Sequence, residues 1–241
     1  MKNLTLSPNM NIKKLIVPGT RLYVYIIDDF LLDMTSVMNF AHNIAYFHPM
    51  FADNSYYPGV RDNMPQPYLR LLQAFFEGNI LPDITNKSDY AVVVHKCLLS
   101  LIACKPANLL IDQKIPHIDS CDERDYAFVH YLSDKALGGT SIYKYTPENI
   151  IEFKQSDKPL LAAMVNNAKQ KHAEHKGYIV DTTSLFEQVL KIEAKFNRLV
   201  IYQGNLLHSA NITSTNSYCK DTKVGRLSIA SFASIKPLQL Y

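Results

Sequence analysis

The second half of the chain consists of short runs of strand-forming residues, and this pattern limits what it can fold into. The runs 126–132, 140–145, 199–204 and 226–232 are rich in Val, Ile, Tyr and Phe, and turn residues such as Gly138 separate them. Short strands must pair with one another to bury their side chains. Several of them in succession are typical of a β-sandwich or barrel. The sequence therefore predicts a mainly β core.

Helical patterns lie mostly outside these runs. Apolar residues recur at helical spacing over residues 30–46, and a second helix is predicted between Pro67 and Phe76 because Pro is favoured in the first turn. The apolar run 91–103 fits either a buried strand or a buried helix, and its length favours a helix. We therefore expect an α+β protein with helices flanking a β core.

Composition indicates one folded domain spanning residues 1–241. Apolar residues make up 47% of the chain, which is enough for one core, and the net charge of +3 comes without a basic run or nucleic-acid-binding motif. No apolar run is long enough to span a membrane, and no signal peptide is evident. The four cysteines show no metal-binding or disulfide spacing. These features predict a cytoplasmic protein with reduced thiols.

One set of polar residues has the order and spacing of a metal site. His117 and Asp119 are two positions apart in a segment, 111–119, that we expect to be extended, so their side chains would share one face. His208 can supply a third ligand. Two imidazoles and one carboxylate on one face suit non-haem Fe(II). A single His is more often a core or surface residue than a ligand, so the prediction rests on the ordered set.

A basic strand follows this set. Arg226 and Ser228 alternate on the run RLSIASF and share a face, so the guanidinium and the hydroxyl can meet one carboxylate. Arg is suited to this task because its planar fork binds a carboxylate with two parallel hydrogen bonds.

With these motifs, the chain resembles the 2-oxoglutarate/Fe(II)-dependent dioxygenase superfamily, in particular its prolyl-4-hydroxylase-like branch. The resemblance covers residues 22–235 and rests on segments in the family's order: YVYIIDDFLLDMTSV, HID, YAFVHYLSD with GGTSIYKY, LLHSA and RLS. It implies a double-stranded β-helix (jelly roll), Fe(II) bound by His117, Asp119 and His208, and 2-oxoglutarate held through its distal carboxylate at Arg226. O₂ is the second co-substrate, and ascorbate is an expected stimulant.

The chain departs from the family pattern in two places. Arg226 lies farther beyond His208 than the pattern leads us to expect, and residues 146–195 are expected to form a helical insertion. An N-terminal helical region over about 28–80 completes the predicted domain.

Other residues are candidates for the walls of the site. Tyr131 and Thr140 flank the Gly138-Gly139 turn and are predicted to line the co-substrate pocket. Three residues of the loop 54–65 are candidates for substrate contact, although a packed surface loop with its arginine in a salt bridge explains them equally well: Tyr56, Tyr57 and Arg61. His172 and His175 are expected on a solvated helix face.

The resemblance implies hydroxylation or a related oxidation of a C–H bond in an amino acid, a peptidyl side chain or a small metabolite. Asp119 favours hydroxylation over halogenation, because halogenating members of the superfamily replace the carboxylate ligand with a small residue. Two alternatives stay open. One is a catalytically silent jelly-roll binding protein, and the other is a cupin-like metalloenzyme that uses Zn²⁺ or Mn²⁺ without an oxo acid.

Overall fold

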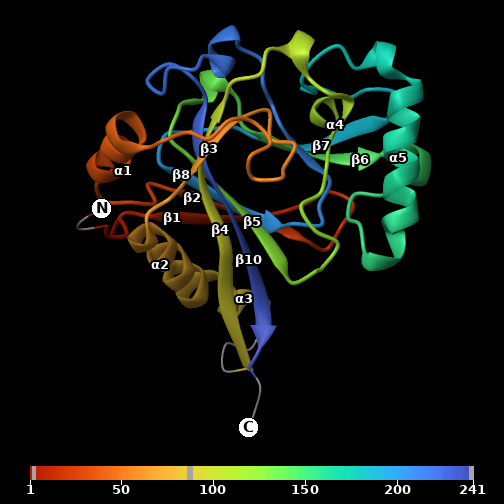
Figure 1. The fold of residues 1–241 in the computed structure, drawn as a ribbon. Coiled ribbons are helices and arrows are strands. Elements are labelled where there is room, and N and C mark those ends of the chain that lie inside the picture. The colour runs from red at the N-terminus through yellow and green to blue at the C-terminus, as the bar shows by residue number, and fades with distance from the viewer. Residues whose placement is uncertain (2–3, 86–88, 239–241) are drawn as a thin grey trace.

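Two antiparallel β-sheets form the core of the fold (Figure 1). The computed structural model describes residues 1, 4–85 and 89–238. The larger sheet has seven strands in the order β1-β2-β8-β5-β10-β4-β3, and the smaller has three in the order β7-β6-β9. The strands are β1 (Asn11–Ile16), β2 (Tyr23–Asp28), β3 (Gly59–Asn63), β4 (Tyr90–Ile102), β5 (Asp125–Tyr131), β6 (Thr140–Tyr145), β7 (Phe186–Ile192), β8 (Arg198–Gln203), β9 (His208–Ala210) and β10 (Leu227–Pro237).

Helices are short and lie around the sheets. The α-helices are α1 (Thr35–Asn39), α2 (Gln66–Phe75), α3 (Leu81–Ile84), α4 (Ile111–Lys114) and α5 (Lys158–Gln170). Two π-helical turns, η1 (Phe40–Ile44) and η2 (Phe76–Ile80), continue α1 and α2. The 3₁₀ turns are η4 (Pro106–Asn108), η5 (Lys135–Leu137), η6 (Thr146–Glu148), η7 (Gln155–Asp157), η8 (His172–Glu174) and η9 (Thr215–Tyr218). No helix in the described ranges is long and apolar enough to cross a membrane.

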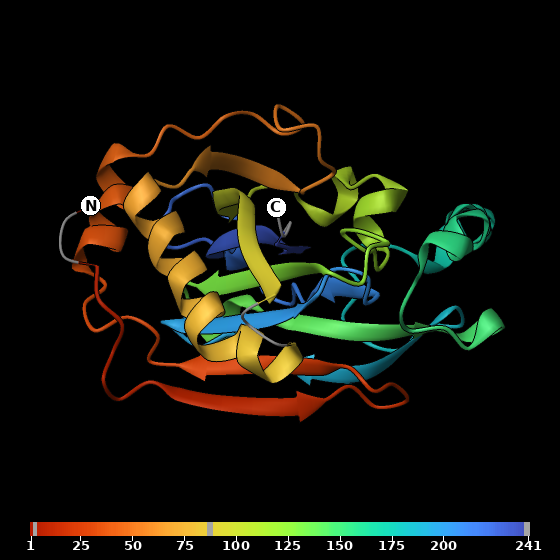
Figure 2. The ribbon, with the colours of Figure 1, turned by 90° about the horizontal axis from the view of Figure 1, so that it is seen from below.

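The larger sheet has two differently used faces. On one face, Phe128 packs against Phe76 with ring centroids 5.3 Å apart, within a cluster that includes Leu72 of α2. Figure 2 shows α2 lying across this face. On the other face, Tyr131 and Tyr202 pack toward the smaller sheet. Full burial of each large apolar side chain contributes about 1.5–3 kcal/mol, so both faces stabilise the sheet.

The predicted β core is confirmed at the level of fold class, and the four predicted strand runs coincide with β5, β6, β8 and β10. The helix predicted over 91–103 is wrong, because this segment is β4. β4 lies between β10 and β3, and its last residues are buried on both faces. A strand buried on both faces reads as a continuous apolar run, and this removes the alternation that would have identified it.

The N-terminal region is less helical than expected. The predicted helix 30–46 is reduced to α1 and η1, because the backbone N–H groups of residues 30–32 donate to Thr5 and Asn197 instead of taking part in a helix. The second predicted helix is α2, and it continues through Gly78 as η2. The strand β3 also falls within the region 28–80.

Two further expectations need correction. Residues 146–195 are only partly helical, because β7 follows α5 and pairs with β6 at the edge of the smaller sheet. Figure 1 shows α5 beside these two strands. The segment 111–119 is not extended throughout, since α4 occupies its first four residues. Only its end runs as extended chain alongside β9.

Candidate metal centre

His117 and His208 are held together by their own backbones. The His117 N–H donates to the His208 carbonyl at 2.9 Å, and the His208 N–H donates to the His117 carbonyl at 2.8 Å. Their rings lie 4.5 Å apart between centroids. The Asp119 N–H donates to the Gly204 carbonyl at 2.8 Å, which places the carboxylate beside them. One ligand atom from each of the three side chains lies within 4.8 Å of the others, so the predicted residues converge on one point.

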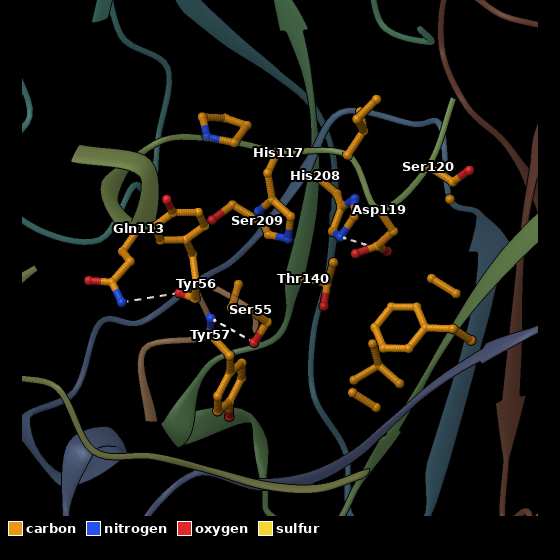
Figure 3. Close-up of a pocket in the computed structure, with 18 of the residues that line it drawn as sticks. Ser55, Tyr56, Tyr57, Gln113, His117, Asp119, Ser120, Thr140, His208 and Ser209 are labelled. Carbon is orange, nitrogen blue, oxygen red and sulfur yellow. Dashed lines mark hydrogen bonds and ion pairs between the residues drawn. The ribbon is translucent and has the colours of Figure 1, made fainter. Parts of the chain in front are cut away.

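The His208 ring is oriented for ligation. Its Nδ1 lies 2.8 Å from the Leu206 carbonyl, which can only accept a hydrogen bond, so Nδ1 carries the proton. Nε2 therefore presents its lone pair, and it faces Asp119 Oδ2 at 3.4 Å (Figure 3). An edge-on contact with the Tyr202 ring, at 4.8 Å between centroids, fixes the other side of the imidazole. Metal-binding histidines are commonly oriented in this way by a carbonyl.

The enclosing walls of the site shift its titrations. Desolvation in the cavity disfavours the imidazolium form of His117 and lowers its pKa, and the nearby charge of Arg61 acts in the same direction. Desolvation raises the pKa of the Asp119 carboxyl, and the charge of Arg61 opposes that rise. At neutral pH His117 is therefore in the uncharged form that binds metals. Two nitrogens and one carboxylate oxygen on one side of an ion suit Fe(II) and are compatible with Zn²⁺ or Mn²⁺.

The three residues open onto a cavity of about 750 Å³. The cavity lies between the two sheets and is also lined by residues of α4, α5 and the loop before β3. Figure 3 shows His117, Asp119 and His208 pointing toward one another at this cavity, with Thr140 nearby. Its volume falls in the range of small-molecule sites, which is about 300–1,000 Å³.

Arg226 lines the same cavity and is only 3% exposed. Its Nε donates to the Gly138 carbonyl at 2.9 Å, and its Nη2 donates to the Gly139 carbonyl at 3.2 Å. No carboxylate of the described residues lies within ion-pair distance of it. A buried cation that lacks an anion is costly, so the geometry favours an anion bound from the cavity.

Gly138 and Gly139 are required for this arrangement. A Cβ on Gly138 would lie 1.6 Å from the Asn211 carbonyl oxygen, and the residue has a positive φ of 96°. A Cβ on Gly139 would lie 1.9 Å from the Ile192 carbonyl oxygen. Only glycine lets the backbone pass here and aim its carbonyls at Arg226.

The other predicted co-substrate residues lie near Arg226. Ser228 and Thr140 are buried and line the cavity. Tyr131 lies behind them in the core between the sheets, with its hydroxyl 2.7 Å from Thr140 Oγ1 and its ring 5.5 Å from the Arg226 guanidinium carbon. Tyr131 therefore supports the cavity wall from behind.

All three candidates line the cavity, but the predicted loop 54–65 is interrupted by β3, which carries Arg61. Tyr56 is 61% exposed at the rim. Arg61 forms the alternative salt bridge, with Nη1 2.8 Å from Asp53 Oδ2, and its guanidinium carbon lies 3.8 Å from the centre of the Tyr57 ring. The Tyr57 hydroxyl is shielded from solvent and has no hydrogen-bond partner among the described residues. Arg61 therefore both forms the salt bridge and lines the cavity.

Several groups that shape the candidate site were not predicted from the sequence. The apolar wall formed by Leu161, Met164 and Val165 of α5 has a sequence signal, because these positions are spaced as one helix face. The Leu206 carbonyl has none, since a backbone group is independent of residue type. The solvated position expected for His175 is wrong, because it is 4% exposed and packs against Phe186.

A comparison with protein families matches residues 8–233 to DUF6445, a family of unknown function. The chain belongs to the DUF6445 family. The matched region contains both sheets, apart from the last four residues of β10, and all three candidate ligands, so the site lies within the part of the chain that defines DUF6445 membership. No curated protein matches the chain.

Proposed function

We propose that this DUF6445 protein is a non-haem Fe(II), 2-oxoglutarate-dependent dioxygenase that hydroxylates or otherwise oxidises a C–H bond of a small-molecule or peptidyl substrate. The observation that carries the proposal is the combination in one cavity of the His117–Asp119–His208 cluster with the buried cation Arg226, which has no carboxylate partner among the described residues. A metal site alone would suit many activities. The added cation selects those that use an anionic co-substrate.

The strand pairing supports a jelly-roll core for this proposal. Eight consecutive extended segments, from β4 through the His117 segment to β10, pair first with last: β4 with β10, the His117 segment with β9, β5 with β8, and β6 with β7. This is the order produced when one long antiparallel hairpin wraps into two facing sheets. The wrapping brings the second and seventh segments together, and these carry the candidate ligands.

The chain's own groups have separable tasks in this function. His117, Asp119 and His208 would hold the ion on one side and leave its other positions facing the cavity. When bound, Fe(II) with O₂ and 2-oxoglutarate supplies the oxidising equivalents, and succinate and CO₂ are the co-products. Arg226 would bind and orient the distal carboxylate, with the Ser228 hydroxyl on the same strand face. The apolar walls exclude water from the reacting groups.

All four cysteines, at positions 97, 104, 121 and 219, are free thiols. This is compatible with the reducing cytoplasm, where Fe(II) is readily maintained and where we place the protein as part of the proposal.

Succinate release tests the proposal. Purified protein with Fe(II), ascorbate and 2-oxoglutarate should release succinate slowly without substrate and faster with the correct one. Asp119→Ala should abolish the release, because the loss of the anionic ligand weakens metal binding. Asp181→Ala, at an exposed carboxylate outside the cavity, is the matched control and should behave as wild type.

The other outcomes identify the alternatives. If wild type and Asp119→Ala release succinate at the same background rate across amino acids, peptides and metabolites, the catalytically silent binding protein is the better description. Tight binding of Zn²⁺ or Mn²⁺ without any binding of 2-oxoglutarate would instead favour the cupin-like metalloenzyme.

A further inference from the structure

A second arginine lines the cavity from the side of β3. Arg61 uses Nη1 for hydrogen bonds to Asp53 Oδ2 at 2.8 Å and Ser55 Oγ at 3.1 Å. Its remaining edge, formed by Nε and Nη2, makes no hydrogen bond with the described residues, and Nε is shielded from solvent. A shielded donor without an acceptor is unfavourable, so this edge is suited to a ligand that supplies one.

Arg198 shows what the same edge binds elsewhere in this molecule. Its Nε and Nη2 donate to the two oxygens of Asp28 at 2.6 and 3.0 Å. Two parallel N–H groups match the two oxygens of a carboxylate, which is why this pairing is specific as well as strong. The unused edge of Arg61 offers the same two donors.

Arg61 is held rigidly in place. It pairs with Ser100 in the ladder between β3 and β4, and its guanidinium stacks on the Tyr57 ring at 3.8 Å. The loop behind it is fastened to α4, because Gln113 Nε2 donates to the Tyr56 carbonyl at 3.1 Å (Figure 3). A group that is already immobilised loses little conformational entropy when it binds a ligand.

The position of Arg61 relates it to the metal centre. It lines the same cavity as His117 and Asp119. Apolar side chains of α5, Leu161 and Val165, supply another part of the wall. The cavity therefore combines the candidate metal ligands, a second cation and apolar surface that suits a hydrocarbon group.

We propose that Arg61 binds a carboxylate of the substrate, so that the substrate of this enzyme is a carboxylic acid with an apolar portion. This inference rests on the proposed function and specifies its substrate class. Arg226 and Arg61 then have different roles, the first toward 2-oxoglutarate and the second toward the molecule that is oxidised. The carboxylate can belong to a simple organic acid or to the C-terminus of an amino acid or peptide.

Matched acid and amide probes test the proposal by binding, which needs no iron. Hexanoate is compared with hexanamide, and N-acetyl-L-leucine with its amide, by ligand-detected NMR titration of the full chain saturated with 2-oxoglutarate. Each acid should bind wild type about tenfold or more tightly than its amide, as expected for one charge-assisted hydrogen bond. If only the hexanoate pair shows this preference, the carboxylate belongs to a simple organic acid. If only the N-acetyl-L-leucine pair shows it, the carboxylate belongs to the C-terminus of an amino acid or peptide.

Variants separate substrate binding from loop anchoring. Arg61→Gln should reduce the acid preference to less than about threefold, and Arg61→Lys should leave an intermediate value because a point charge replaces the two-donor edge. Asp53→Asn removes the charge of the anchor but keeps that edge, so it should retain the preference. Succinate release with each acid is then compared with release without it.

Three results would overturn the inference. They are equal binding of acid and amide by wild type, an unchanged preference in Arg61→Gln, or the same loss in Asp53→Asn as in Arg61→Gln, which would reduce Arg61 to a loop anchor. If 2-oxoglutarate itself does not bind, the proposed dioxygenase function fails. The acid and amide comparison is then made without it and decides the role of Arg61 independently.

Discussion

Replacement of Arg226 by Met should at least halve the stabilisation of the protein by 2-oxoglutarate. A ligand that binds only the folded state at 100 times its Kd stabilises that state by about 2.7 kcal/mol. In a chain of 241 residues each kcal/mol raises the melting temperature by about 2–4 °C, so wild type should gain roughly 5–10 °C. Arg226 is buried and has no competing carboxylate among the described residues. If its loss weakens binding by about tenfold or more, at most about 1.4 kcal/mol of the stabilisation is left, so the variant should gain half of the wild-type shift or less.

The assay is differential scanning fluorimetry of each protein with and without 2-oxoglutarate, in the presence of Zn²⁺ to avoid turnover. Each shift is measured against the ligand-free baseline of the same variant, which removes the effect of the lost bonds to the Gly138 and Gly139 carbonyls. Arg198→Met is the control, because Arg198 pairs with Asp28 and lies outside the metal-site cavity, and its shift should match wild type. An equal shift in Arg226→Met and wild type would refute the assignment of Arg226 to the co-substrate.

Three further predictions concern the scaffold. Gly138→Ala should lose more than about 1 kcal/mol of unfolding free energy in urea, because its Cβ would lie 1.6 Å from the Asn211 carbonyl oxygen at a φ of 96°; wild-type stability would contradict this. Tyr68→Phe removes a buried hydroxyl 2.8 Å from His130 Nδ1 and should cost about 1–3 kcal/mol in the same assay, with metal affinity unchanged. Burial lowers the pKa of His130 to about 4, whereas a His in the unfolded chain has a pKa of about 6.5. Between these two pH values the unfolded state binds more protons than the folded state, so the free energy of unfolding falls as the pH drops from about 6.5 to about 4. His130→Gln should therefore lose less stability than wild type between about pH 6.5 and pH 4, and an equally steep loss would rule out this contribution.

The parts of the fold that the sequence predicted are those with a local signal. β5 and β10 are rich in strand-forming residues and are preceded by turn residues, so their type could be read directly, although β10 extends to Pro237, five residues beyond the predicted run. The strand β4 could not, because Leu98 and Leu99 are both buried and point to opposite faces. Whether an apolar run is a strand or a helix depends in such a case on neighbours that are remote in sequence.

As with the fold, only part of the candidate site could be predicted from the sequence. The convergence of His117, Asp119 and His208 could be predicted, because residue type and order carry the information. Strand periodicity explains this convergence only in part. The helix α4 precedes the motif, and the β-bridge between His117 and His208 is the motif's one β-pairing among the described residues. The free edge of Arg61 could not be predicted, because it depends on which guanidinium nitrogen donates a hydrogen bond to Asp53.

The backbone bridge between His117 and His208 has a consequence for the lifetime of a bound ion. These residues are far apart in the chain, yet each donates its N–H to the carbonyl of the other, and this bridge is isolated because β9 pairs with β6 and not with the His117 segment. Separation of the imidazoles therefore requires this bridge to open. Ion escape and local unfolding become coupled events, and the amide protons of His117 and His208 would record both. Metal that binds there should slow the exchange of these two protons with solvent far more than the exchange of the amides on β1, an edge strand of the larger sheet.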